Sequence, residues 1–435
     1  MEKLSNWGMF PTIEANQIAP NDNAELIKFF NSKDVIIARG NGRCYGDSSL
    51  QTDIISTLSL NKILSFDQKN GILSCEAGIL LSEILKVIIP KGFFLPVTPG
   101  TKLITLGGAV ASNIHGKNHH SEGSFSRYVL SFELLIETGE ILHCSETSNF
   151  NLFKNTMGGM GLTGIILSVK FKLKKIESSY IKQTTIKAKN LDSILSLLEI
   201  HKRSTYAVSW IDCLSKGSNL GKSVLFLGEH VRISDLNKKQ KVNPLKVQKK
   251  QTLNIPFYFP LFVLNRTFIR LFNLFYYKKQ LHPKTDKVID YDSFFYPLDS
   301  INNWNKMYGK NGFVQYQFVI PFESGKEGLR EILNKITNSG CGAFLAVLKT
   351  FGKEDAISSP ISFPMEGYTL AVDFKVNNKV LKLLDELDEI VLRYGGRFYL
   401  AKDARMSAET FSKSYKVNFV HPQKFNSMQS QRLGI

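Results

Sequence analysis

Three clusters of glycine and other small residues, all within the first 170 of 435 residues, constrain this chain most. They are ARGNGRCYGD (38–47), TLGGAVASNIHG (105–116) and TMGGMGLTGII (156–166). Glycine permits positive φ and a close ligand approach, so successive amides can converge on phosphate oxygens. One such cluster alone is more often a simple turn. None has the P-loop spacing GxxxxGK[ST], and none is a GxGxxG that opens a helix, so a P-loop NTPase and a Rossmann-type dehydrogenase are disfavoured.

The order of the three clusters resembles the FAD domain of the vanillyl-alcohol oxidase type flavoproteins, over roughly residues 10–175. The resemblance implies that the first loop wraps the pyrophosphate of FAD, the second follows the ribityl chain and flavin, and the third closes on the cofactor. The residues that it implies for cofactor binding are Ala38, Arg39, Gly40, Asn41, Gly42, Arg43, Cys44, Tyr45, Gly46, Asp47, Ser48, Gly100, Thr105, Leu106, Gly107, Gly108, Ser112, Asn113, Ile114, His115, Ile166 and Tyr399.

Many flavoproteins of this type attach the flavin covalently to a histidine in the first loop. The corresponding residue here is Arg43, which cannot form that bond. We therefore expect FAD to be bound non-covalently.

Four further motifs narrow the resemblance: IHGKNHHSEGSF (114–125), YPLDSINNWNKMYG (296–309), GFVQYQFVIP (312–321) and GGRFYLAKDAR (395–405). They are similar to the family of decaprenylphosphoryl-β-D-ribose 2-oxidases, over almost the whole chain. This resemblance implies FAD-dependent oxidation of the 2-hydroxyl of a polyprenyl-phospho-β-D-ribose to the 2-keto sugar. That reaction is the first half of an epimerisation to the arabinose form, used for cell-envelope glycans. The alternative is a soluble FAD-dependent sugar, alditol or aldonolactone oxidase.

Oxidation of an alcohol by flavin needs a group that accepts the hydroxyl proton and donors that place the sugar. The resemblance implies catalytic roles for His115, Lys402 and Tyr45. It implies substrate binding by Trp210, Gln315, Gln317, Lys349 and Tyr296. From the residues alone, a structural histidine, a solvated lysine and a core tryptophan stay open as alternatives, and the proton acceptor is undecided.

Two details come from strands near the site. Gln315 and Gln317 are two residues apart in a predicted strand. Their side chains therefore lie on the same face, and both can point into a pocket. In the strand YTLAVDF, Ala371 stands where the mycobacterial family members carry a cysteine. We expect oxidation to proceed without that thiol.

The resemblance implies an α+β fold, with a two-lobed FAD-binding domain of the vanillyl-alcohol oxidase type. A substrate domain with an antiparallel sheet flanked by helices completes it. We predict the FAD-binding domain over residues 1–178, the substrate domain over 179–396, and a return of 397–435 to the FAD domain. The five cysteines show no metal-ligand or disulfide spacing, so no metal site is expected.

A formal charge of +17 raises nucleic acid, an anionic membrane and phosphorylated substrates as partners. Between residues 236 and 285 there are eleven Lys or Arg and no Asp or Glu, around a stretch dense in phenylalanine. We predict a helix over 261–275 with an apolar sector of Leu264, Phe268, Leu271, Phe272 and Phe275. The alternative is a helix packed on the core, but these features favour an anionic lipid interface.

Because the excess charge accompanies apolar residues and no nucleic-acid-binding motif occurs, a nucleic-acid partner is disfavoured. The expected partners are a polyprenyl-phospho-sugar, an anionic membrane surface and a short-chain reductase that completes the epimerisation. The expected location is cytoplasmic and peripheral, on the inner face of the plasma membrane, because the N-terminus lacks a signal-peptide pattern.

Overall fold

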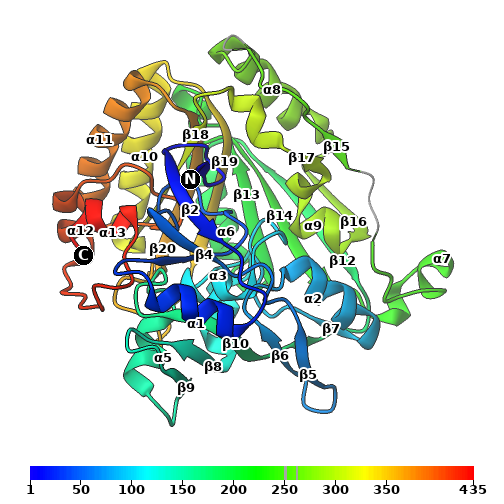
Figure 1. Ribbon diagram of the computed structural model, residues 1–435. Coiled ribbons are helices and arrows are strands. Elements are labelled where there is room, and N and C mark those ends of the chain that lie inside the picture. The colour runs from blue at the N-terminus through cyan, green and yellow to red at the C-terminus, as the bar shows by residue number, and fades with distance from the viewer. Residues whose placement is uncertain (249–251, 261–262) are drawn as a thin grey trace.

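The computed structural model describes residues 1–248, 252–260 and 263–435. It consists of an N-terminal half built on two small sheets and a second half built on one large sheet (Figure 1). The helices are α1 (Asn23–Asn31), α2 (Leu81–Ile88), α3 (Leu106–Ala111), α4 (His119–Glu122), α5 (Phe150–Thr156), α6 (Leu191–Ile200), α7 (Lys238–Lys241), α8 (Arg266–Lys279), α9 (Tyr291–Phe295), α10 (Phe322–Ser339), α11 (Asn378–Arg393), α12 (Ala408–Tyr415) and α13 (Met428–Leu433).

The first small sheet has the order β1-β2-β4-β3, and the second has the order β5-β6-β10-β8-β9. β7 and β11 form a separate pair. β8 and β9 form an antiparallel hairpin, and Gly139 has the positive φ that its turn requires. The strands are β1 (Glu2–Ser5), β2 (Thr12–Ile18), β3 (Ile37–Arg39), β4 (Asp53–Ser56), β5 (Ile63–Asp67), β6 (Ile72–Glu76), β7 (Phe93–Phe94), β8 (Val129–Leu135), β9 (Ile141–Ser145), β10 (Ile165–Lys172) and β11 (Lys174–Lys175).

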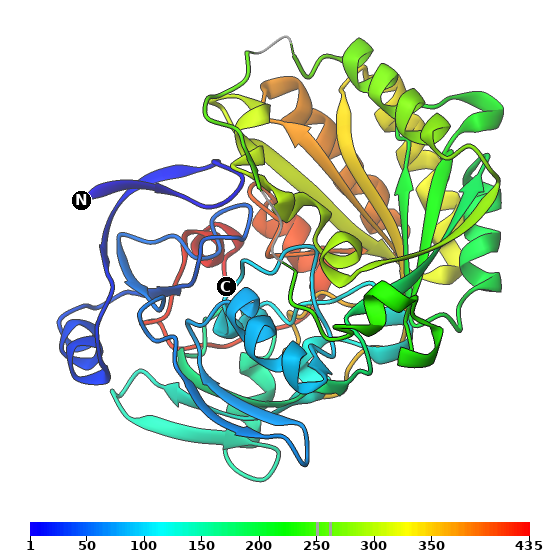
Figure 2. The same cartoon turned by 90° about the vertical axis from the view of Figure 1, so that its right-hand side faces the viewer.

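The second half contains an eight-stranded sheet in the order β16-β12-β14-β13-β19-β20-β18-β21 (Figure 2). All seven neighbouring pairs are antiparallel. β15 and β17 pair with each other outside this sheet. The strands are β12 (Tyr180–Ala188), β13 (Tyr206–Ile211), β14 (Ser223–His230), β15 (Leu253–Asn254), β16 (Lys284–Asp290), β17 (Ile301–Asn302), β18 (Phe313–Ile320), β19 (Ala343–Phe351), β20 (Gly367–Lys375) and β21 (Arg397–Phe398).

The central strands of the large sheet separate apolar from polar side chains by simple alternation. The apolar side chains of β18 and β20 that join the core with α6, α10 and α11 are Val314, Tyr316, Phe318, Ile320, Leu370, Val372 and Phe374. The intervening residues point to the opposite face. On that face the register pairs Gln315 with Asp373 and Gln317 with Ala371. The sheet therefore presents a row of polar groups, here called the site face, toward the N-terminal half.

The C-terminal segment ties the two halves together. β21 pairs with β18 in the large sheet, whereas the residues after it contact the N-terminal half. The amide of Tyr45 donates to the carbonyl of Ala401 at 3.0 Å, and the amide of Ile36 donates to that of Lys424 at 2.8 Å. The chain enters the eight-stranded sheet at β12, directly after β11, which pairs with β7. The domain limits at residues 178 and 396 stay a prediction.

The helix predicted over 261–275 is α8, and its bounds differ from the prediction. It begins at Arg266, because the Asn265 side chain accepts the amide of Phe268 as an N-cap, and it continues to Lys279. Residues 261 and 262 lie outside the described residues. Neither α8 nor any other helix of the described ranges is long and apolar enough to cross a bilayer.

Candidate active site

His115, near the end of the second glycine cluster, contacts the site face of the large sheet. Its Nε2 is 3.2 Å from Nε2 of Gln317 on β18, and its Nδ1 is 3.0 Å from Nζ of Lys349 on β19. Its ring packs against those of Phe351 and Tyr399, with centroids 4.7 and 5.2 Å away. Burial, followed by the charge of Lys349, lowers the pKa of His115 well below its usual value. The imidazole is therefore neutral at physiological pH.

These contacts determine where the proton of the neutral ring sits. Because the Gln317 amide donates to Nε2, the ring carries its proton on Nδ1 and directs it at the Lys349 amine. Burial lowers the pKa of Lys349 to about 7, and the charges of Lys117 and Lys402 act in the same direction. The unprotonated amine of Lys349 is thus accessible near neutral pH.

A second group of predicted residues gathers around Tyr45. Nζ of Lys402 lies 3.9 Å from the centroid of the Tyr45 ring. The Tyr45 hydroxyl accepts from Nε2 of Gln315 at 3.3 Å, and the same nitrogen donates to Asp373 at 2.6 Å. Burial lowers the pKa of Lys402 to about 8, although the negative charge of Asp373 opposes the shift.

The remaining predicted substrate-binding residues, Trp210 and Tyr296, make separate contacts. Trp210 pairs with Val347 in the register, so its side chain shares the site face with Lys349. Its ring packs 4.7 Å from that of Tyr276 on α8. Tyr296 is fully buried, and its hydroxyl lies 2.7 Å from that of Thr98.

Two site residues were missed by the sequence reasoning. Lys117 is half-buried, donates to the carbonyl of Phe294 and lies 4.3 Å from the Phe294 ring, and burial lowers its pKa to about 7. Its own carbonyl accepts the amide of Ala207 on β13 at 2.8 Å. Asp373 is the other, and strand alternation could have found it, because it follows Ala371 by two residues. No comparable pattern marks Lys117.

The glycine loops are built for close approach. A Cβ at position 40 would lie 2.2 Å from Oγ1 of Thr105, the residue that caps α3. A Cβ at Gly46 would lie 2.0 Å from the carbonyl oxygen of Asp403. The first loop can therefore touch the second loop and the C-terminal segment only because these positions are glycine.

The donors of the first loop fit a pyrophosphate. No hydrogen bond among the described residues uses the amides of Gly40, Asn41 or Gly42, and Nε of Arg39 is buried without a partner there. Free amides and a guanidinium are the donors that bind phosphate oxygens best. Arg43, at the position of the tethering histidine, lies over the Trp7 ring at 4.0 Å. These residues fit a bound FAD.

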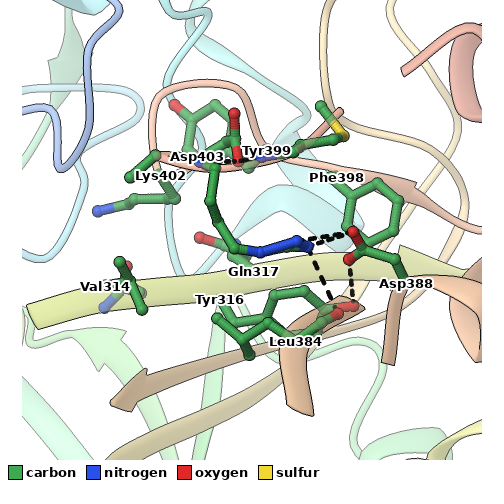
Figure 3. Close-up of a pocket in the computed structure, with 13 residues that line it drawn as sticks. Val314, Tyr316, Gln317, Leu384, Asp388, Phe398, Tyr399, Lys402 and Asp403 are labelled. Carbon is green, nitrogen blue, oxygen red and sulfur yellow. Dashed lines mark hydrogen bonds and ion pairs between the residues drawn. The ribbon is translucent and has the colours of Figure 1, made fainter. Parts of the chain in front are cut away.

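A small cavity of about 20 Å³ lies between β18 and the segment 398–406 (Figure 3). On its helix side, Asp388 accepts from the Tyr316 hydroxyl at 3.0 Å and forms an ion pair with Arg405. A space of this size holds about one water molecule. The cavity is therefore too small to hold a sugar, although Gln317, Tyr399 and Lys402 of the candidate site also line it.

Comparison with known proteins agrees with this geometry. Residues 19–145 match the model of an FAD binding domain. The chain is 36% identical to decaprenylphosphoryl-β-D-ribose oxidase of Mycolicibacterium smegmatis, over 95% of this chain and 91% of the relative. The chain belongs to this oxidase family. It is an FAD-dependent oxidoreductase that acts on an alcohol group, and the resemblance seen in the sequence is confirmed.

More distant relatives share less of the chain. A D-2-hydroxyglutarate dehydrogenase of Rattus norvegicus is 32% identical over 27% of this chain and 23% of its own length. The solved structure of a BBE-like protein of Physcomitrella patens has a TM-score of 0.64 and 14% identity, over 92% of this chain and 85% of that one. This likeness shows the fold, and it confirms the predicted α+β class and flavoprotein type.

Proposed function

We propose that this family member oxidises the 2-hydroxyl of a polyprenyl-phospho-β-D-ribose to the 2-keto sugar. Support comes from the 36% identity to an oxidase named for decaprenylphosphoryl-β-D-ribose, which extends along almost the entire chain. The structural observation that carries the proposal is the contact of His115 with Gln317 and Lys349, which places a neutral base on the site face. Bound FAD supplies the hydride acceptor in such an oxidation.

The proton of the hydroxyl group leaves through His115. In the complex the substrate hydroxyl takes the place of the Gln317 amide at Nε2 of the neutral ring, which accepts the hydroxyl proton, while the Nδ1 proton passes to the amine of Lys349, 3.0 Å away. The net result is a protonated Lys349 and a neutral imidazole that now carries its proton on Nε2 instead of Nδ1. Lys402 places a positive charge beside Tyr45, where the resemblance puts the flavin, and favours the electron-rich reduced ring.

The phosphodiester of the substrate needs a positive partner. Lys117 is half-buried beside α9, close enough to Lys349 for their charges to interact. An anion bound next to Lys117 would offset the unfavourable burial of its ammonium group. We therefore assign Lys117, together with Trp210 and Tyr296, to the phosphosugar.

The test is anaerobic reduction of the bound flavin in the purified holoenzyme. Farnesyl-phospho-β-D-ribose should bleach the oxidised flavin absorbance and yield a 2-keto sugar. The unphosphorylated pentose, alditols and aldonolactones should reduce the flavin far more slowly. Faster reduction by an alditol or a lactone than by the phospholipid would favour the soluble sugar or alditol oxidase instead.

We also propose that α8 docks the enzyme on an anionic membrane. The helix exposes apolar side chains: Phe275 is 69% and Leu271 is 50% exposed. Its polar Asn273 is instead buried and donates to Asp212 at 2.7 Å. An outward apolar face with lysines in its last turn fits an interface of anionic lipids better than it fits water.

A membrane location agrees with a substrate whose polyprenyl tail stays in the bilayer. We infer a peripheral location on the inner face of the plasma membrane and a role in arabinan synthesis for the cell wall. Epimerisation requires the new ketone to be reduced again on the other face. A short-chain reductase is therefore the proposed partner.

A further inference from the structure

Asp373 is a buried carboxylate on the site face that the chemistry described above does not use. Its exposed fraction is 0%. One carboxylate oxygen accepts from Nε2 of Gln315 at 2.6 Å, and the other accepts from the hydroxyl of Tyr308 at 3.1 Å. Within the described ranges no cation lies at ion-pair distance from it. A buried carboxylate held only by neutral donors is costly, which calls for a compensating role.

The cation that faces Asp373 is Lys402. Tyr45 stands between them: its hydroxyl shares the Gln315 donor with Asp373, and its ring carries the Lys402 ammonium at 3.9 Å. Burial lowers the pKa of Lys402 to about 8 and raises that of Asp373 to about 6, and the charge of each residue opposes the shift of the other, so the two charges interact across this ring.

The other titratable groups around Lys402 do not take the place of Asp373. They are Cys44 and Tyr45 in the first loop, His115 in the second and Lys349 on β19. Cys44 acts on the pKa of Lys402 in the same direction as Asp373 but less strongly. Burial raises the pKa of Tyr45 and lowers that of His115, so both are neutral, and Lys349 repels a second ammonium group when protonated. Asp373 is thus the anionic group that faces Lys402.

We propose that Asp373 is a positioning residue that acts through Lys402, keeping it protonated and over the Tyr45 ring, so that a cation and not an amine faces the flavin. The inference rests on FAD binding and not on the identity of the sugar. Opposite unit charges that interact in a partly buried site change a pKa by about one unit or more. Without Asp373, burial alone would release the Lys402 proton near neutral pH.

The test follows the midpoint potential of the bound flavin against pH, with redox dyes and no sugar. A group whose pKa depends on the flavin's oxidation state changes the slope of this plot at its pKa values. The slope change due to Lys402 is identified by its absence in Lys402→Met. In Asp373→Asn we expect the slope change due to Lys402 at a pH about one unit lower than in the wild type. Tyr308→Phe removes a hydrogen bond that lowers the pKa of Asp373, so it should move the slope change in the same direction as Asp373→Asn but by less.

The double variant Lys402→Met/Asp373→Asn decides whether the effect passes through Lys402. It should behave as Lys402→Met alone, because the two groups act as one unit. A slope change at the wild-type pH in Asp373→Asn would overturn the proposal, and so would an Asp373→Asn effect that persists without Lys402. If Asp373→Asn does not retain FAD, Asp373→Glu is measured instead, because it keeps the negative charge. A slope change at the wild-type pH in Asp373→Glu supports the proposal, and a slope change at another pH refutes it. Failure of a polyprenyl-phospho-ribose to reduce the flavin would refute the proposed substrate and leave this result standing.

Discussion

Lys349 and His115, 234 residues apart in the sequence, meet with Nζ of the lysine 3.0 Å from Nδ1 of the imidazole. Because neither residue carries a negative charge, the contact is a hydrogen bond and not an ion pair: the Nδ1 proton of the ring is directed at the amine. The pKa of Lys349, lowered to about 7 by burial, makes this pair a base matched to neutral pH.

The pair predicts the acid limb of the pH profile. Flavin reduction by substrate requires the unprotonated Lys349 amine, so the rate should rise as pH increases through about 7. Lys349→Met should lose this limb and slow reduction about 100-fold or more, within the usual range for general-base catalysis. Stopped-flow bleaching of the flavin between pH 5.5 and 9 measures both effects. Lys353→Met, an exposed lysine nearby, is the matched control, and an unchanged acid limb in Lys349→Met would remove Lys349 from the proton path.

Lys402 predicts a loss of rate without a loss of cofactor. Its charge favours the reduced flavin over the oxidised one, which lowers the barrier to hydride transfer. Lys402→Ala should slow flavin reduction about tenfold to thousandfold, or about 1.4–4 kcal/mol of barrier, and should leave FAD bound. Lys402→Arg keeps the charge without the compact geometry and should be intermediate. Lys413→Ala, at an exposed ion pair with Glu409, is the control. Wild-type reduction by Lys402→Ala would show that Lys402 does not act on the flavin.

The sequence predicted the parts of this site that depend on local pattern. Glycine clusters mark loops wherever they fold, and strand alternation places Gln315 and Gln317 on one face. Lys117 follows no such pattern, because its neighbours Ala207 and Phe294 come from distant segments. The His115–Lys349 contact likewise depends on how a loop docks on a sheet, which a spacing rule does not contain.

The helix α8 shows the same limit in its bounds. Apolar periodicity located a helix and its exposed sector, but the N-cap of Asn265 sets where the helix begins. The inward turn of Asn273 depends on Asp212, 61 residues earlier. No single-segment pattern reveals that partner.

Arg43 predicts a dissociable cofactor. A guanidinium lying over Trp7 cannot form the covalent bond that a histidine makes at this position. Acid precipitation should therefore release FAD to the supernatant, where its absorbance and fluorescence are measured. Yellow colour retained by the washed pellet would contradict this prediction.

The outward face of α8 predicts binding to anionic vesicles. Leu271→Glu/Phe275→Glu places two charges where the side chains are 50% and 69% exposed, so the fold should tolerate them. Transfer of each apolar side chain to lipid contributes about 1.5 kcal/mol or more, and its loss should abolish co-sedimentation with vesicles that contain phosphatidylglycerol.

The matched control is Ile200→Glu, a 70% exposed apolar residue at the end of α6, and this variant should bind vesicles as the wild type does. Because the flanking lysines act on anionic lipid, 0.5 M salt should weaken wild-type binding. Loss of FAD together with vesicle binding in the double variant would instead show that this face packs against protein.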